Sequence, residues 1–221
     1  MFIGHFAVGF GAKRLAPAVS LGTLILACQL ADLVWPTLVL LGIEHLSIAP
    51  GITVVTPLNF ESYPYSHSLV ALICWASLAA VIYRLAHRSA KTAAVLVIAG
   101  VVLSHWVLDV ATHRPDMPLV PGGDTKVGLG LWNSLPATII IEGAMLAAGV
   151  TIYAQATRAK DRVGTLALWS LVAFLAVLYV GNLFGPPPPS VMAVAWSAEA
   201  IWLLVAWGYW IDRHRSVRKV A

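Results

Sequence analysis

Three ionisable side chains recur at intervals of four residues in the stretch VLSHWVLDVATHRPD, residues 102–116: His105, Asp109 and His113. In a helix this spacing places them on one face, within about 80° of arc. An ionisable side chain inside an apolar membrane helix is costly unless it pairs, lines a wet cavity or binds an ion. Two histidines and a carboxylate one turn apart are also a partial ligand set for a divalent metal. The stretch therefore predicts a functional site.

The composition indicates a polytopic membrane protein. Of the 221 residues, 59% are hydrophobic and only 11% are charged, and the mean hydropathy is +0.82. The length allows about six spans of about 20 residues and leaves no room for a separate soluble domain. The net charge of +4 does not indicate nucleic-acid binding, because the lysines and arginines lie in short clusters at span ends. Both cysteines fall in apolar runs, so no disulfide is expected.

We expect an all-α membrane helical bundle that forms a single integral membrane domain over residues 1–221. Residues 2–12 would reach only about 17 Å as a helix, so we expect a half-helix that turns at Lys13 and Arg14 and forms a hairpin with the first span. Ser66 is expected to cap the second span. The expected spans are residues 16–41, 66–85, 92–113, 135–156, 163–184 and 190–211. Every basic cluster falls on the same side of the membrane, which predicts that this side is cytoplasmic and that the C-terminus lies there. Because Lys13 and Arg14 follow the first apolar run instead of preceding it, no cleavable signal peptide is expected and the N-terminus should be retained.

With this topology, the intramembrane polar residues fall in one layer of the outer half of the membrane. At a rise of about 1.5 Å per residue, Asp32 lies about 13 Å deep, His105 about 12 Å and Glu142 about 10 Å. Each residue alone has an ordinary explanation, such as packing against a neighbouring helix. Together they predict a polar functional cavity, because each costs a few kcal/mol near the membrane centre unless its neighbours satisfy it. The layer comprises His5, Asp32, His67, His105, Asp109, Glu142 and Glu199.

Four short motifs within residues 1–116 resemble those of the bacterial membrane-bound metal-dependent hydrolases, a family defined by a domain formerly of unknown function. The motifs are Gly4-His5, Asp32, Ser66-His67-Ser68 and Ser104-His105-x-x-x-Asp109. The typical member reads Gly-His, Pro-Asp-x-Asp, Thr-His-Ser and Ser-His-x-x-x-Asp, a ligand pattern similar to that of zinc-dependent phospholipase C. This sequence departs in having one carboxylate fewer around Asp32 and serine at position 66. Residues 117–221 are expected to supply additional transmembrane helices.

The resemblance implies a multi-pass protein of the bacterial inner membrane, and a metal-dependent hydrolase. We expect it to act from the outer leaflet on a lipid or lipid-linked ester or phosphoester. One or two divalent ions are expected, Zn²⁺ in view of the mixed nitrogen and oxygen donors. Glu142 or Asp116 is expected to take the proton from the attacking water. The expected metal ligands are His5, Asp32, His67, His105 and Asp109. The expected partners are membrane lipids and a small lipid-like substrate.

Two alternatives use the same residues differently. A proton-coupled or metal-ion transporter needs intramembrane carboxylates and imidazoles, with His105, Asp109, Asp32 and Glu142 as a relay or a transient ion site. The sequence shows no inverted repeat, and its polar residues cluster in one leaflet, which disfavours transport. A structural membrane protein without chemistry would leave the cavity empty and its histidines dispensable.

Overall fold

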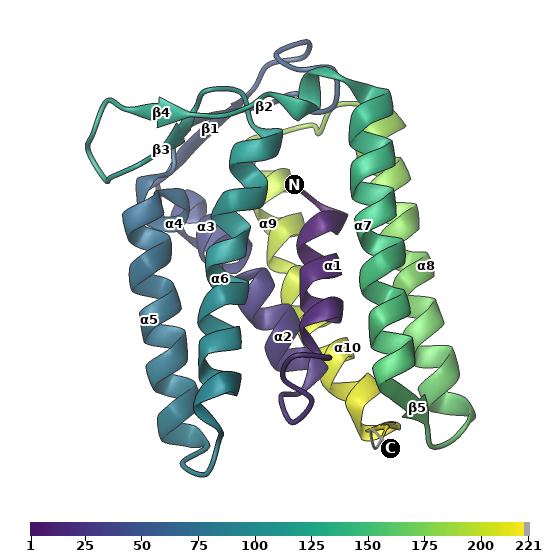
Figure 1. Ribbon diagram of the computed structural model, residues 1–221. Helices are drawn as coiled ribbons and strands as arrows, with labels where there is room; N and C mark the ends of the chain where they lie inside the picture. Colours follow the sequence, from purple (N-terminus) through teal and green to yellow (C-terminus); the bar gives the residue numbers. More distant parts are fainter. Residues whose placement is uncertain (219–221) are drawn as a thin grey trace.

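The computed structural model describes residues 1–218 and confirms a membrane helical bundle (Figure 1). Five helical segments of the described chain are long and apolar enough to cross a membrane. Four are single helices, and the fifth, residues 191–213, divides into α9 and α10 at Ala200. Their bounds are α5 Leu69–Ala86, α6 Thr92–Thr112, α7 Leu135–Ala156, α8 Arg162–Phe184, α9 Val191–Glu199 and α10 Ile201–Arg213.

The first predicted span, residues 16–41, is a broken helix. The α2 helix (Leu21–Cys28) begins after Ser20, whose side chain accepts a hydrogen bond from the Thr23 amide, and α3 (Leu30–Leu40) follows at an angle of 55°. The break falls at Gln29, which has non-helical backbone angles of φ −108° and ψ 9°. Counted as one bent span, the pair gives up to six crossings, as predicted from the sequence.

The capping residue of the second predicted span lies two residues later than expected. Ser66 lies inside a separate short helix, α4 (Pro64–His67), and it is Ser68 that caps α5 by accepting a hydrogen bond from the Ala71 amide. The expectation that Ser66 caps this span is therefore wrong. The Ser66 hydroxyl instead contacts Glu44 and His67.

The short α1 helix (Ile3–Ala12) lies in the centre of the bundle between α6 and α7 (Figure 1). The chain then returns through residues 13–20 into α2, which confirms the predicted half-helix and hairpin. Close packing of α1 depends on small residues: a Cβ added to Gly149 of α7 would lie 2.3 Å from the Ala7 carbonyl oxygen. Such contacts let helix backbones approach each other where no hydrophobic effect holds them together.

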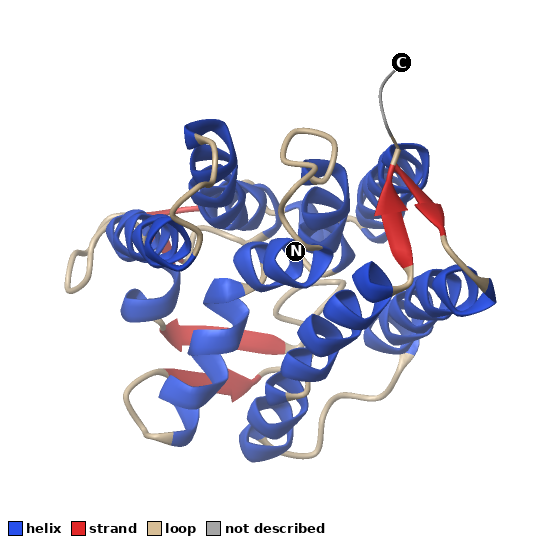
Figure 2. Cartoon of the chain, turned by 90° about the horizontal axis from the view of Figure 1, so that it is seen from below, coloured by secondary structure: helices blue, strands red, loops and turns tan. Residues whose placement is uncertain are grey.

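Small antiparallel sheets lie at both ends of the bundle. At the end near the N-terminus, β1 (His45–Ile48) pairs with β2 (Leu58–Ser62), and β3 (Met117–Pro118) pairs with β4 (Lys126–Val127). A 3₁₀ turn, Leu131–Asn133, leads into α7. At the other end, β5 (Thr157–Ala159) pairs with β6 (Arg215–Val217) close to the C-terminus (Figure 2). This pairing ties the loop between α7 and α8 to the segment that follows α10.

Candidate metal centre

His105 and Asp109 form the centre of a buried polar cluster. Both lie on the inward face of α6, four residues apart, and are 1% and 2% exposed. His105 Nε2 lies 3.1 Å from Asp109 Oδ2. The helical spacing read from the sequence therefore brings the two side chains together.

His5 joins this pair from α1. Its Nε2 lies 3.0 Å from Asp109 Oδ1, and its ring stacks on that of His105 with centroids 3.7 Å apart. The residue is 1% exposed. The hairpin that places α1 inside the bundle is what carries His5 to this level.

Asp32 and His67 complete the cluster from the other side. Asp32 lies in the first turn of α3, just after the break at Gln29, and His67 ends α4. His67 Nε2 is 3.4 Å from Asp32 Oδ1 and 3.8 Å from Asp109 Oδ2. The Asp32 side chain keeps 27% of its surface exposed, so the cluster is open on this side.

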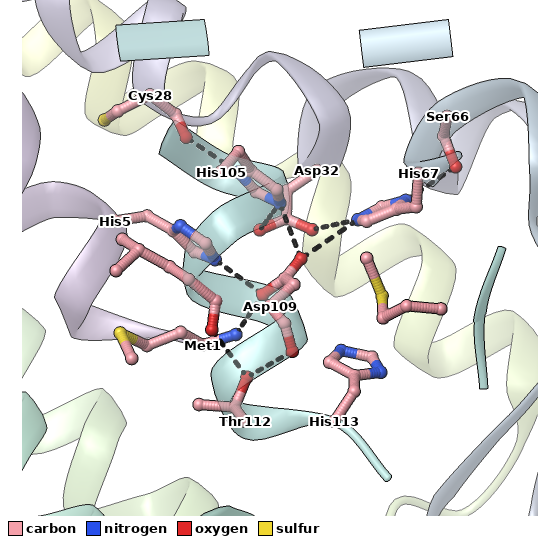
Figure 3. A network of polar contacts seen from close by, with 12 residues as sticks. Met1, His5, Cys28, Asp32, Ser66, His67, His105, Asp109, Thr112 and His113 are labelled. Atoms are coloured by element: carbon pink, nitrogen blue, oxygen red, sulfur yellow. Dashed lines mark hydrogen bonds and ion pairs between the residues drawn. The ribbon is translucent and has the colours of Figure 1, made fainter. Parts of the chain in front are cut away.

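The five residues predicted as metal ligands thus converge from α1, α3, α4 and α6 and point toward one another (Figure 3). They form two overlapping triads in which the possible ligand atoms lie within 4.8 Å of one another. His105 belongs to both. The triads are His5, His105 and Asp109, and Asp32, His67 and His105.

Hydrogen bonds fix the tautomer of His105 in a form suited to metal binding. Its Nδ1 lies 2.8 Å from the Cys28 carbonyl oxygen, which can only accept, so Nδ1 carries the proton. Nε2 is then left with its lone pair directed into the cluster; Asp109 Oδ2 lies 3.1 Å away, but Nε2 makes no aligned hydrogen bond within residues 1–218. Metal-binding histidines commonly show this arrangement, in which the second nitrogen donates to a carbonyl or carboxylate.

A similar series of hydrogen bonds orients His67. Its Nδ1 lies 2.7 Å from Ser66 Oγ, and that hydroxyl donates to Glu44 Oε2 at 2.6 Å. Because the hydroxyl proton is directed to Glu44, the Ser66 oxygen accepts from His67 Nδ1. Nε2 of His67 therefore also presents a lone pair to the cluster.

The charges of the cluster favour a cation. Two carboxylates, Asp32 and Asp109, face imidazoles whose nitrogen lone pairs point inward. The ammonium group of Met1 forms an ion pair with Asp109 Oδ1. Burial of carboxylates is costly without positive partners. The donor set and the surplus of negative charge together fit a divalent metal ion, so the buried triads could hold one.

The two predicted proton acceptors, Glu142 and Asp116, lie outside both triads. Glu142 Oε2 accepts hydrogen bonds from the backbone amides of Phe2 at 2.9 Å and Gly4 at 3.3 Å. Its carboxylate thereby satisfies the first turn of α1, the helix that carries His5. Glu199 lies apart from the cluster, where it accepts a hydrogen bond from Thr37.

Asp116 belongs to a neighbouring network with His113 and Tyr63. Its Oδ1 accepts from the Tyr63 hydroxyl at 2.9 Å and lies 3.0 Å from His113 Nδ1, while Oδ2 accepts from Arg114. Burial lowers the pKa of His113. Burial alone would raise the pKa of Asp116, but hydrogen bonds from His113 and Tyr63 hold it below its usual range. The backbone amide of His113 donates to the Asp109 carbonyl, so this network adjoins the cluster.

Sequence reasoning missed the groups that orient the ligands. These are the Met1 ammonium, the Cys28 carbonyl, the Ser66 hydroxyl and the Glu44 carboxylate. Only Ser66 carried a sequence signal, since it directly precedes a candidate ligand. A backbone carbonyl has no residue signature, and Glu44 lies in a loop far from the other motifs.

One known family model matches most of the chain. A family model described as YdjM inner membrane protein matches residues 1–185, a region that contains both triads and ends at the end of α8. Comparisons with curated proteins and with solved structures gave no significant match. The matched region spans most of the 221 residues, and the helices of the structure agree with a multi-pass location in the inner membrane. The chain belongs to the YdjM inner membrane protein family.

Proposed function

We propose that the protein is a membrane-embedded, metal-dependent hydrolase that acts on a lipid or lipid-linked ester or phosphoester. The observation that carries the proposal is the convergence of three imidazoles and two carboxylates in two overlapping triads that share His105. Burial of the two carboxylates is costly without enough positive charge to balance them.

The proposed ligands divide between the two triads. His5 and Asp109 bind from one side, Asp32 and His67 from the other, and His105 lies between them. A divalent ion held there, Zn²⁺ by the donor set, supplies Lewis-acid catalysis, which polarises an ester or phosphoester and makes water more acidic.

The chain's own groups position the substrate and move the proton. The partly exposed Asp32 marks the side from which a substrate approaches. Glu142 and Asp116 are the proposed proton acceptors, and each adjoins the cluster through one neighbour: Glu142 through the first turn of α1, and Asp116 through His113. Ser66 and Cys28 hold the histidine tautomers during turnover.

An apolar groove supports a lipid as the substrate class. It has a volume of about 520 Å³ and runs between α1, α6 and α7. Val101 in its wall lies one helical turn from His105, and Val8 lies one turn from His5. An acyl chain in this groove would place an ester or phosphate group near the cluster. The residues that form most of the wall are Val8, Gly11, Leu15, Val97, Gly100 and Val101.

Elemental analysis of protein purified in detergent without chelator tests the proposal. We expect about one or two equivalents of a divalent metal in the wild type, and loss of that metal in folded His105→Ala and Asp109→Ala. His45→Ala removes an exposed histidine outside the cluster and serves as the matched control. Metal-loaded wild type is then assayed for hydrolysis of phospholipids and isoprenoid phosphates, with the same variants as blanks.

Two results would count against the proposal. A folded wild type with less than about a tenth of an equivalent after reloading would exclude a resident metal. Normal metal content in folded His105→Ala would show that the metal binds elsewhere. Metal that exchanges across vesicle membranes, without hydrolysis of any substrate, would instead support the transporter.

A further inference from the structure

The paired strands β5 and β6 lie at the opposite end of the bundle, which Figure 1 marks by β5. A polar cavity lies beside them. Its volume is about 310 Å³. It lies between the turn that follows α1 and the segment that follows α10, and it has no part in the proposed hydrolysis. The polar residues of its wall are Lys13, Ser20, Thr157, Asp212, Arg215 and Ser216.

Asp212 is the acidic residue of this wall, and its charge is already compensated. Its carboxylate accepts from the Tyr153 hydroxyl at 3.1 Å and from the Leu21 amide at the start of α2. Lys13, which is 5% exposed, forms an ion pair with it at 3.4 Å and also donates to the Val19 carbonyl. Lys13 and Asp212 therefore neutralise each other.

Arg215 has no such partner. The residue is 9% exposed, and its guanidinium donates to two neutral acceptors, Thr157 Oγ1 at 3.1 Å and the Gly164 carbonyl at 3.0 Å. It also lies over the Tyr153 ring, 5.5 Å from the centroid. No carboxylate within residues 1–218 lies within ion-pair distance of it. A buried cation without a counter-charge is costly, so an anion in the cavity would stabilise this end of the fold.

The surroundings strengthen the preference for an anion. Lys160 and Arg218 lie beside the paired strands β5 and β6, and within residues 1–218 their side chains donate to carbonyl oxygens. The nearby Asp161 is paired with His214 at 2.8 Å. Positive charge at this end thus exceeds the negative charge available to balance it.

We propose that this cavity binds a phosphate group, presented by the headgroup of an anionic phospholipid. Guanidinium groups pair with phosphate oxygens in a planar, charge-assisted geometry, and the hydroxyls of Ser20 and Ser216 offer further polar contacts. Basic pockets at the ends of transmembrane helices are well placed for such headgroups. Asp212, Arg215 and Ser216 lie beyond residue 185, outside the region that matches the family model.

A thermal-unfolding titration of the full chain, delipidated in non-ionic detergent, tests this site. Tryptophan fluorescence gives the midpoint as the protein is titrated with short-chain phosphatidylglycerol, inorganic phosphate or short-chain phosphatidylcholine. Ala18 is an exposed residue of the cavity wall, so Ala18→Asp adds a carboxylate without removing a contact, and Ala18→Asn is the matched control. Arg215→Gln and the exposed Arg158→Gln form a second pair.

We expect phosphatidylglycerol to raise the midpoint of the wild type, Ala18→Asn and Arg158→Gln. The half-saturating concentration should rise at least about tenfold in Ala18→Asp and in Arg215→Gln. A response to phosphatidylglycerol alone identifies the phospholipid, whereas an equal response to inorganic phosphate identifies the free anion as a sufficient ligand. The proposal is overturned if neither phosphatidylglycerol nor phosphate shifts the midpoint. It is also overturned if Ala18→Asp and Ala18→Asn respond alike.

Discussion

The imidazole rings of His5 and His105 lie face to face, with centroids 3.7 Å apart and planes inclined by only 2°. Two protonated rings at this separation would repel each other strongly in a buried site. The arrangement therefore disfavours protonation of both rings together and leaves at least one in the unprotonated form that binds a metal ion. It also depends on the position of α1, since His5 reaches His105 only if α1 packs closely inside the bundle.

Close packing of α1 can be tested at Gly149. A Cβ there would lie 2.3 Å from the Ala7 carbonyl oxygen, so Gly149→Ala should push α1 away from α7. We expect the free energy of unfolding to fall by about 1–3 kcal/mol and metal content to fall with it. Gly143→Ala on the same helix, where a Cβ meets nothing within 4 Å, should leave both unchanged. Equal effects of the two substitutions, measured by thermal unfolding and elemental analysis, would contradict this account.

The orientation of His67 provides a second test. Ser66→Ala removes the hydroxyl that links His67 Nδ1 to Glu44, so the ring loses its fixed tautomer. Loss of such an orienting group typically costs about 10–100-fold in metal affinity. Competition with a chromophoric chelator measures the change. Ser77→Ala removes an exposed hydroxyl that only contacts its own helix, and it should not alter affinity.

The sequence was sufficient to predict the bundle, because long apolar runs and terminal basic clusters determine the spans of a membrane protein directly. It also predicted the half-helix, since residues 2–12 are too short to cross. The break at Gln29 was not predictable in this way. No proline or glycine marks it, and the hydropathy of residues 21–40 continues through it.

The five proposed ligands could be selected from the sequence by combining helical spacing and span depth with the motifs that resemble those of the metal-dependent hydrolases. The expected depth of a residue in the membrane could not by itself distinguish metal ligands from other polar residues at the same level. Glu142 lies at a similar expected depth but caps α1, and Glu199 lies with Thr37. Which way a side chain points around its helix depends on packing between helices. The Cys28 carbonyl has no residue signature and Glu44 lies in a loop, so neither could be found from the sequence.

Two roles of Glu142, as a proton acceptor in hydrolysis and as a cap of α1, can be tested separately. Glu142→Gln weakens the interactions with the Phe2 and Gly4 amides, and we expect a loss of about 1 kcal/mol in the free energy of unfolding. If Glu142 takes a proton during hydrolysis, activity per folded, metal-loaded molecule should also fall by about 100-fold or more. If it only caps α1, activity should follow the folded fraction. Glu199→Gln, at a carboxylate outside the cluster, is the control for both measurements.

The pH dependence of stability should reflect the protonation of His113. Burial lowers its pKa, and its hydrogen bond with Asp116 opposes this shift only in part. The unfolded chain keeps an ordinary value of about 6.5, so it binds more protons than the folded chain once the pH falls below that value. Neutral His113 therefore contributes fully to the free energy of unfolding above about pH 6.5. This contribution is lost as the pH falls toward the pKa that His113 has in the folded protein.

We accordingly expect the unfolding midpoint of chelator-treated protein to fall between about pH 7.5 and 5, and to fall less steeply in His113→Gln. Asp116 does not contribute in this window, because its lowered pKa confines its effect to more acidic conditions. His45→Gln removes an exposed imidazole and should keep the wild-type slope. An identical slope in wild type and His113→Gln would show that His113 is not held neutral by burial. The low-pH loss of stability would then have to arise from other titrating groups.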